Sequence, residues 1–378
     1  MITYPAIIRT TGLSLMMASV MAVGLAVAEP PIAPKPPGTK PEAPVAEAAP
    51  DGELAAIPTP KVKPDDIPPA AAPSGPYERW AADFRSRLLA KGEFSAEFLD
   101  EQLADLKLIQ RAIELDRRQP ERTLTHAEYL TRVVSQTRTN QGIDRFKRYR
   151  EDLRAAEEKF GVPAEIVTAL WGIETSYGAI TGGFVVRDAL ATLAFEGRRR
   201  SFFEAELVNL LKIIEQEDRD YREMLGSWAG AMGQSQFMPS SFLAYAVDGD
   251  GDGKRDIWGT QRDVFASAAN YLKQSGWREG ERWGRAVSLP SGFDRSLVGS
   301  DTRRSINAWR DLGVTLRDGS ELPPALENFT ARLIQPDGAG GPAFLAYRNF
   351  DVILRWNRSN YFATAVGILS DRILIGAE

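Results

Sequence analysis

The distribution of proline limits which part of this chain can fold. Most of its 24 prolines fall in residues 29–76, a stretch that is otherwise rich in alanine and scattered charges. Such a composition cannot bury a hydrophobic core, and it favours extended backbone of the polyproline type. We therefore expect residues 29–76 to be a disordered linker, either a tether or an inert tail, and the fold to be confined to residues 77–378.

The first 28 residues have the pattern of a secretory signal peptide. Arg9 is followed by a mostly apolar run at 13–27, and residues 26–28 (Ala-Val-Ala) are the small residues that a signal peptidase reads. The run is short for a membrane span, although an uncleaved N-terminal anchor is the alternative. The chain has no cysteine to carry a lipid. We expect a secreted protein that is not a lipoprotein and keeps no stable membrane anchor.

Histidine and cysteine are almost absent. With one histidine, His126, and no cysteine, the chain cannot build disulfides, thiol nucleophiles or metal sites that need several of these residues. Acid–base chemistry must then rely mostly on carboxylates, tyrosine or lysine. The formal net charge of −5, without a basic bias, makes nucleic acid a poor partner.

Helical periodicity dominates the rest of the chain. Apolar residues recur at helical spacing through 77–109, Pro120 breaks the pattern, and Thr125 can cap a helix that begins at His126, to which we give no catalytic role. Short strands are expected in WGRAVSLP, FTARLIQP and AFLAYRNF, and a loop at 225–262. The fold class is therefore mainly α with a minor β element. Further helices are expected at 142–159, 164–177, 188–195, 202–218, 264–274, 305–312 and 361–374.

The most informative stretch, residues 164–178, reads AEIVTALWGIETSYG. On a helix, Val167, Leu170 and Glu174 share one face, so the carboxyl group of Glu174 lies on an apolar stripe. Burial should raise its pKa, as the protonation of a glycosidic oxygen requires. A structural glutamate paired with a buried arginine explains the pattern equally well. Gly172 and Gly178 leave room for a ligand or for backbone.

A second stretch, residues 226–241, reads GSWAGAMGQSQFMPSS. Its composition favours a rigid loop that displays the amides of Gln234 and Gln236 between Gly233 and Pro239. Amides and hydroxyls beside an aromatic ring are groups with which proteins hold sugars and acetamido substituents. A plain connection between helices is the alternative.

Five segments together resemble the lytic murein transglycosylase B family of lysozyme-like enzymes, which cleave peptidoglycan. In chain order they are GVPAEIVTALWGIETSYG, VRDALATLAF, SWAGAMGQSQFMPSSFLAYAVDGDGDG, ANYLKQSGW and RWNRSNYFATAVG, and the resemblance covers about residues 77–376. It implies a lysozyme-like (α+β) catalytic core at about 150–280 plus 350–378, a helical N-terminal part and a small β-containing part at about 281–350. It also implies an enzyme that binds glycan strands. Together with the signal peptide, this makes us expect a periplasmic location, where the linker could reach other cell-wall enzymes.

The resemblance assigns roles to single residues. Glu174 corresponds to the family's catalytic acid and base. Arg199 and Arg200 match an arginine pair that contacts carboxylates of the stem peptide, with a solvated basic turn as the alternative. Trp356 stands where relatives often have tyrosine, which leaves a hydroxyl contact there in question. The expected substrate-binding residues besides the arginines are Tyr129, Ser227, Gln236, Tyr271, Asn357 and Tyr361.

The implied reaction needs a single carboxyl group. Glu174 protonates the oxygen between N-acetylmuramic acid and N-acetylglucosamine, while the sugar's acetamido group stabilises the oxocarbenium-like centre. The ionised Glu174 then accepts the proton of the muramoyl 6-hydroxyl, which attacks the anomeric carbon and leaves a 1,6-anhydro end. The rivals are a muramidase that uses water with a second carboxylate, and a catalytically inactive cell-wall-binding scaffold.

Residues 248–256, DGDGDGKRD, have the beginning of a calcium-binding loop. Acidic residues occupy positions 1, 3 and 5, and a glycine occupies position 6, where the loop turns sharply. Position 12 is Gly259 instead of glutamate, and the resemblance offers a later carboxylate in its place. We expect a structural Ca²⁺ ion, with a metal-free Asx turn as the alternative. The expected ligands are Asp248, Asp250, Asp252, the backbone carbonyl of Lys254, and Asp263.

Overall fold

The computed structural model describes residues 75–117, 124–323 and 329–378, so the expected signal peptide, nearly all of the linker and Pro120 lie outside it. The described part is mainly α-helical with a five-stranded sheet and a two-stranded one, which confirms the predicted fold class. None of the helices in these ranges is long and apolar enough to cross a membrane.

One group of helices packs around a shared hydrophobic cluster that includes the N-terminal part. In α1, Trp80, Phe84 and Leu88 recur at helical spacing and are buried, as the sequence periodicity predicts. The short β1 (Phe184–Val185) pairs with β2 (Leu225–Gly226) beside this cluster. The helices of the group are α1 (Pro76–Lys91), α2 (Ala96–Leu103), α3 (Gln110–Arg117), α8 (Val186–Glu196), α9 (Arg200–Glu217) and α10 (Pro239–Tyr245).

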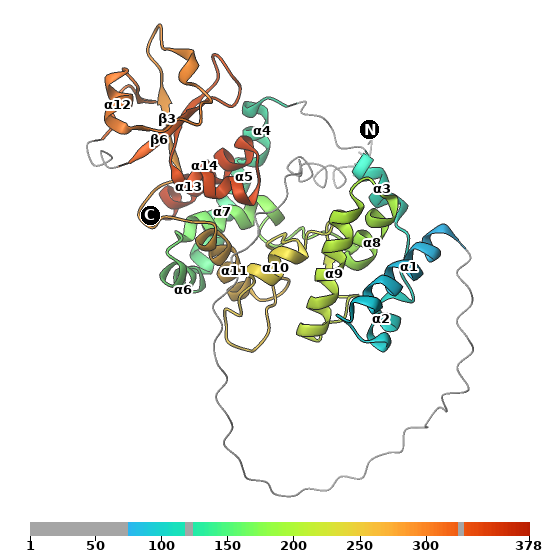
Figure 1. Ribbon diagram of the computed structural model, residues 1–378. Coiled ribbons are helices and arrows are strands. Elements are labelled where there is room, and N and C mark those ends of the chain that lie inside the picture. The colour runs from blue at the N-terminus through green and yellow to red at the C-terminus, as the bar shows by residue number, and fades with distance from the viewer. Residues whose placement is uncertain (1–74, 118–123, 324–328) are drawn as a thin grey trace, which may run out of the picture.

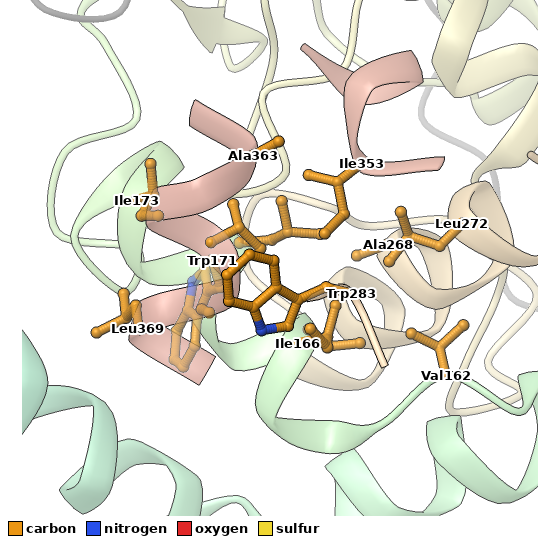
Figure 2. Close-up of a cluster of buried hydrophobic side chains, with 14 of the residues drawn as sticks. Val162, Ile166, Trp171, Ile173, Ala268, Leu272, Trp283, Ile353, Ala363 and Leu369 are labelled. Atoms are coloured by element: carbon orange, nitrogen blue, oxygen red, sulfur yellow. The ribbon is translucent and has the colours of Figure 1, made fainter. Parts of the chain in front are cut away.

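A second group surrounds α7 (Ala164–Thr175), in which every residue except Glu165 is buried. Helix α7 contacts α5, α6, α11 and α14, so its apolar sequence reflects burial on all sides. Figure 2 shows part of this cluster, in which side chains of α7 meet those of α11, α13 and α14. The other helices of the group are α4 (His126–Val133), α5 (Gln136–Arg148), α6 (Arg150–Phe160), α11 (Gln261–Gln274), α13 (Arg348–Trp356) and α14 (Asn360–Ala377).

The five-stranded sheet is antiparallel throughout, in the order β4-β6-β7-β3-β5. It has a cluster of its own, to which Trp309 of α12 contributes. In Figure 1 this sheet and α12 lie at one end of the described chain, and α1, α2, α8 and α9 lie at the other. The elements are β3 (Gly284–Ser288), β4 (Arg304–Ser305), α12 (Ile306–Asp311), β5 (Thr315–Leu316), β6 (Thr330–Ile334) and β7 (Ala343–Ala346).

Three expected elements are wrong in detail. The helix expected at 142–159 is split into α5 and α6 at Tyr149, whose backbone leaves helical geometry while its ring packs against Trp171 and Phe265. The segment AFLAYRNF forms a strand only as far as Ala346, because the residues that follow begin the amphipathic α13. The expected loop at 225–262 contains α10, which begins with a proline in its first turn.

The backbone directly after α7 is held by one aromatic side chain. Ser176 and Tyr177 adopt left-handed conformations with φ of 50° and 60°, and the hydroxyl of Tyr177 donates to the carbonyl of Arg138 at 2.8 Å. The Tyr177 ring lies against Gly172, where an added Cβ would be 2.5 Å from the ring. The room that Gly172 leaves is therefore filled by the protein's own side chain.

Replacing Gly172 by alanine is expected to lower the melting temperature, although alanine is the better helix former. The added methyl group forces the Tyr177 ring aside, and such overpacking typically costs about 1–3 kcal/mol. Thermal unfolding followed by circular dichroism measures the change. Gly183→Ala is the control, because nothing lies within 4 Å of its Cβ position. A Gly172→Ala variant as stable as wild type would show that the ring is not fixed there.

Candidate active site

Glu174 lies in the last turn of α7 with 8 % of its surface exposed. Burial raises the pKa of its carboxyl group to about 7, and the hydrogen bond from Trp356 opposes this shift. The prediction of a buried carboxyl group with a raised pKa is confirmed. Within the described residues no arginine and no second carboxylate contributes to this shift, so the alternative of a glutamate paired with a buried arginine is not supported.

Trp356 is the hydrogen-bond partner of Glu174. Its Nε1–H, at the end of α13, donates to Oε1 of Glu174 at 2.8 Å. An indole N–H can only donate, so it favours the ionised carboxylate and opposes burial. Relatives often have tyrosine at this position, and here the indole N–H provides a hydrogen bond to Glu174 where a tyrosine hydroxyl is absent. The sequence motif marked this position, but the reach of Trp356 to Glu174 was not foreseen.

Aromatic rings extend the site beside Trp356. Its indole lies 4.8 Å from the ring of Tyr271 and 5.4 Å from that of Phe237, measured between centroids. The Tyr271 hydroxyl donates to the carbonyl of Arg355 at 2.7 Å. Because this hydrogen bond uses the hydroxyl hydrogen, Tyr271 can offer its ring to a substrate but cannot also donate a hydrogen bond to it.

Two further tyrosines lie on the α4 and α14 side of the site. Tyr129 and Tyr361 have ring centroids 5.7 Å apart. Burial raises the pKa of Tyr129, and the negative charge of Glu174 adds to the shift. The Tyr361 hydroxyl donates to Asp337 at 3.2 Å.

A narrow cavity of about 10 Å³ borders Glu174. It is about large enough for one water molecule. Its walls are mostly apolar, and such surroundings stabilise the neutral carboxylic acid over the carboxylate. The lining residues are Val167, Leu170, Trp171, Glu174, Gln234, Ser235, Val264, Phe265, Ala268 and Trp356.

In the glycine-rich loop at 226–241, the side chains of Ser227 and Gln236 form hydrogen bonds with the protein backbone. The Ser227 hydroxyl oxygen accepts hydrogen bonds from the amides of Ala229 and Ala231, at 3.3 and 3.0 Å. The Gln236 amide donates to the carbonyls of Thr181 and Gly233, at 3.0 and 2.9 Å, from a backbone with φ of 49°. Gln236 thereby ties the loop to the segment that follows α7.

The remaining predicted residues lie in different settings. Asn357 follows Trp356, and its Oδ1 accepts from the amide of Ser359 at 3.1 Å. Arg199 pairs with the buried Asp116 at 2.9 Å, which also pairs with Arg198, and it packs over an aromatic ring, so its guanidinium group is held within the fold. Arg200 is exposed. The two arginines therefore differ in what they can offer to a substrate.

The acidic loop brings three of its carboxylates together. Asp248, Asp250 and Asp252 each offer an oxygen within 4.8 Å of the others, and the amide of Gly253 donates to Asp248 at 2.8 Å. Such a set of hard oxygen donors fits a cation such as Ca²⁺. The ammonium group of Lys254 is a cation with no acceptor, so only the backbone carbonyl of this residue would take part.

Asp263, the predicted closing ligand, braces the loop from α11. It is buried, and its two oxygens accept from the amides of Gly249 at 2.8 Å and Asp256 at 2.6 Å. Burial raises the pKa of Asp263, and the charges of Asp250 and Asp248 add to the shift. The carboxylate thus holds both ends of the loop through the backbone.

Known proteins are similar to most of this chain. Residues 76–371 match the family described as Transglycosylase SLT domain. Membrane-bound lytic murein transglycosylase B of Escherichia coli strain K12 is 32 % identical over 311 residues, which cover 78 % of this chain and 82 % of that protein.

Solved structures of lytic transglycosylases are also similar to this chain. SltB3 of Pseudomonas aeruginosa, in complex with NAG-anhNAM-pentapeptide, is 43 % identical with a TM-score of 0.76 over 80 % of both chains. The lytic transglycosylase Slt35 of Escherichia coli, in complex with calcium, is 31 % identical with a TM-score of 0.66 over 79 % of this chain and 93 % of that one. The predicted lysozyme-like fold is confirmed. The chain belongs to the Transglycosylase SLT family and is a lytic murein transglycosylase.

Proposed function

We propose that this enzyme cleaves the β-1,4 bond between N-acetylmuramic acid and N-acetylglucosamine without water, leaving a 1,6-anhydro end. The observation that carries the proposal is Glu174, a buried carboxyl group with a pKa of about 7 that borders a cavity lined by no other carboxylate among the described residues. A group that titrates near neutral pH can donate a proton and then take one back. A hydrolytic mechanism would want a second carboxylate about 5–9.5 Å away.

The reaction proceeds in two proton transfers at one group. The protonated Glu174 gives its proton to the glycosidic oxygen as the bond from that oxygen to the muramoyl anomeric carbon breaks. The carbonyl oxygen of the acetamido group shields the cationic carbon. The Glu174 carboxylate, stabilised by the N–H of Trp356, then accepts the 6-hydroxyl proton while oxygen 6 bonds to the anomeric carbon. Atoms balance with no added water, and the enzyme returns to its acid form.

The aromatic rings beside Glu174 suit a glycan strand. The partly exposed rings of Tyr271 and Trp356, backed by the buried Phe237, provide apolar faces for sugar C–H groups, next to a few polar groups that fix orientation. Ser227, Gln236, Asn357, Tyr129 and Tyr361 are the residues we propose to hold the hydroxyl and acetamido groups.

For stem-peptide carboxylates we propose Arg200 as the main contact of the arginine pair. The guanidinium group of Arg199 is held by the buried Asp116, which also pairs with Arg198, whereas Arg200 is exposed. A pentapeptide-bearing ligand in the SltB3 complex supports a role for the peptide in recognition. A peptidoglycan substrate also supports a periplasmic location for the enzyme. We propose that the linker can contact other cell-wall enzymes there.

Release of soluble muropeptides from purified peptidoglycan tests the proposal against the inactive scaffold. The wild-type enzyme is expected to clear a peptidoglycan suspension and to release products one water lighter than those of a hydrolytic muramidase, as read by mass spectrometry. Binding of the polymer with no products from the wild-type protein would support the scaffold.

We also propose that the acidic loop holds a structural Ca²⁺ ion through Asp248, Asp250, Asp252 and the carbonyl of Lys254, with Asp263 at the closing position. The convergent carboxylates support this, as does the calcium complex of Slt35. When bound, the ion would neutralise the loop's charge. No step of the reaction passes through it.

Calcium is expected to raise the melting temperature of the wild-type enzyme. At a free concentration a hundredfold above the dissociation constant, binding stabilises the folded state by about 2.7 kcal/mol. Thermal unfolding with calcium and with chelator measures this. Asp250→Asn should lose most of the shift, whereas Lys254→Ala should keep it because the carbonyl remains. No shift in the wild-type enzyme would leave the Asx turn as the better account.

A further inference from the structure

Gln234 joins the helix that carries Glu174 to the segment that leaves the acidic loop. It is buried, with 5 % of its surface exposed. On one side, the indole N–H of Trp171 donates to its Oε1 at 2.8 Å, and the hydroxyl of Thr175 donates to its backbone carbonyl at 3.1 Å. Trp171 and Thr175 lie on α7 on either side of Glu174, so both contacts hold its last turn.

On the other side, Gln234 binds the two residues that follow the acidic loop. Its backbone amide donates to the carbonyl of Ile257 at 2.8 Å, and its side-chain Nε2 donates to the carbonyl of Trp258 at 2.8 Å. The amide of Trp258 in turn donates to Asp256 of the loop at 3.0 Å. One side chain therefore connects both segments, as acceptor toward α7 and as donor toward Trp258.

The backbone makes space for this connection. Gly178, just beyond α7, has φ of 81°, and an added Cβ would be 2.3 Å from Oε1 of Gln234. The room that the sequence left for a ligand or backbone is filled by the glutamine amide. Gln234 also lines the small cavity beside Glu174.

We propose that Gln234 is a positioning residue for Glu174, which holds the last turn of α7 against the segment following the acidic loop. Gln234 acts through Trp171 and Thr175 and is not itself proposed to touch the substrate. The proposal rests on Glu174 being the acid, as proposed above. It goes beyond that function because it concerns how the acid is held.

Loss of the amide has consequences at two levels. Without it, the buried N–H of Trp171 and the partly buried carbonyl of Trp258 lose their partner, or they move toward water. A displacement of about 1 Å in a reacting group can cost on the order of 10²-fold in rate. Water entering beside Glu174 would also bring its pKa back down toward the ordinary value.

Few groups near Glu174 can ionise near neutral pH, so a change in its pKa can be followed through the pH profile of activity. The side chains lining the cavity from α7, α11 and α13 are uncharged apart from Glu174 itself. From α4, Tyr129 is the group that interacts electrostatically with Glu174, and burial keeps the pKa of its phenol high. From α5, Arg138 reaches Ser176 just beyond α7 and stays charged throughout, and burial lowers the pKa of His126 of α4 below its ordinary value. A shift of the basic limb that is present in the Gln234 variant and absent from its matched control therefore reports on Glu174.

The test is Gln234→Leu, which keeps the volume and removes the amide. We expect kcat on purified peptidoglycan to fall about 10–100-fold, KM to change less than about twofold, and the basic limb of the pH profile to move to lower pH. Gln102→Leu is the matched control, because Gln102 is also buried but packs with the N-terminal helices. It is expected to change the melting temperature at most.

A conservative variant keeps the test decisive should Gln234→Leu fail to fold. In its neutral form, the side chain of Gln234→Glu can accept from Trp171 and donate to Trp258, so activity should approach wild type at low pH and be lost as the new carboxyl group ionises. Wild-type kcat and pH profile in folded Gln234→Leu would overturn the proposal. So would a rise in KM alone, because Gln234 would then bind substrate directly. Glu174→Gln, assayed in parallel, tests the underlying function separately.

Discussion

Replacing Glu174 by glutamine is expected to lower kcat for muropeptide release by about 10³-fold, within the usual range for loss of a general acid–base group. Glutamine keeps the size of the side chain, and its carbonyl can still accept from Trp356, but it cannot deliver or take back a proton. Initial rates on purified peptidoglycan measure the loss.

The same substitution has a predicted signature in stability. The pKa of Glu174 is raised from 4.5 to about 7 in the folded state, so the folded state binds more protons than the unfolded state between these values. Wild-type stability should therefore fall as pH rises through this window. Glu174→Gln removes the cost of the buried charge and should be at least as stable as wild type above neutral pH, so that lost activity cannot be blamed on unfolding.

Glu165→Gln is the matched control, since Glu165 lies on the same helix in its first turn and is only partly buried. It should keep near wild-type activity. Substantial muropeptide release by Glu174→Gln, from a preparation free of wild-type enzyme, would contradict the assignment of Glu174 as the acid.

Trp356→Phe is expected to move the basic limb of the kcat/KM profile upward by about one to two pH units. The indole N–H favours the ionised carboxylate, so removing it raises the pKa of Glu174 further. A hydrogen bond to a charged group contributes about 1.5–3 kcal/mol, and one pKa unit corresponds to about 1.36 kcal/mol. Maximal kcat should also fall, because the carboxylate formed after the first proton transfer loses its donor. Rates measured across the neutral range test both effects.

Phenylalanine retains an aromatic ring against Phe237 and Tyr271, which separates the hydrogen bond from packing. Trp309→Phe makes the same chemical change in the sheet's cluster, where the indole N–H donates to the carbonyl of Ala331. That variant should lose stability without moving the pH profile. A basic limb that stays in place or moves downward in Trp356→Phe would contradict the proposed role of the indole.

The burial of Glu174 could be predicted because it follows from the pattern of neighbouring residues in the sequence. Periodicity alone places Glu174 on an apolar helix face, and the raised pKa follows from burial on that face. The small residues and amides of 226–241 likewise indicate a loop, and the acidic spacing of 248–256 indicates converging carboxylates. Each of these patterns is contained within about twenty residues of sequence.

What surrounds Glu174 could not be predicted, because it depends on pairings between distant segments. The contact from Trp356 to Glu174 spans 182 positions, and that from Trp171 to Gln234 spans 63. The sequence predicted that the loop displays the amide of Gln234. In the structure this amide is buried and forms its hydrogen bonds with Trp171 and Trp258. The resemblance assigned Arg199 to the stem peptide, with a solvated basic turn as the alternative, and its pairing with Asp116 across 83 positions had no local signal.

The most direct test of the single-carboxylate mechanism is to digest purified peptidoglycan in water enriched in heavy oxygen and to weigh the products. In the proposed reaction the muramoyl 6-hydroxyl is the attacking group, so the muramic acid end should be one water lighter than a hydrolysis product and carry no heavy oxygen. Products that gain one heavy oxygen atom at that end would show attack by water and would contradict the account.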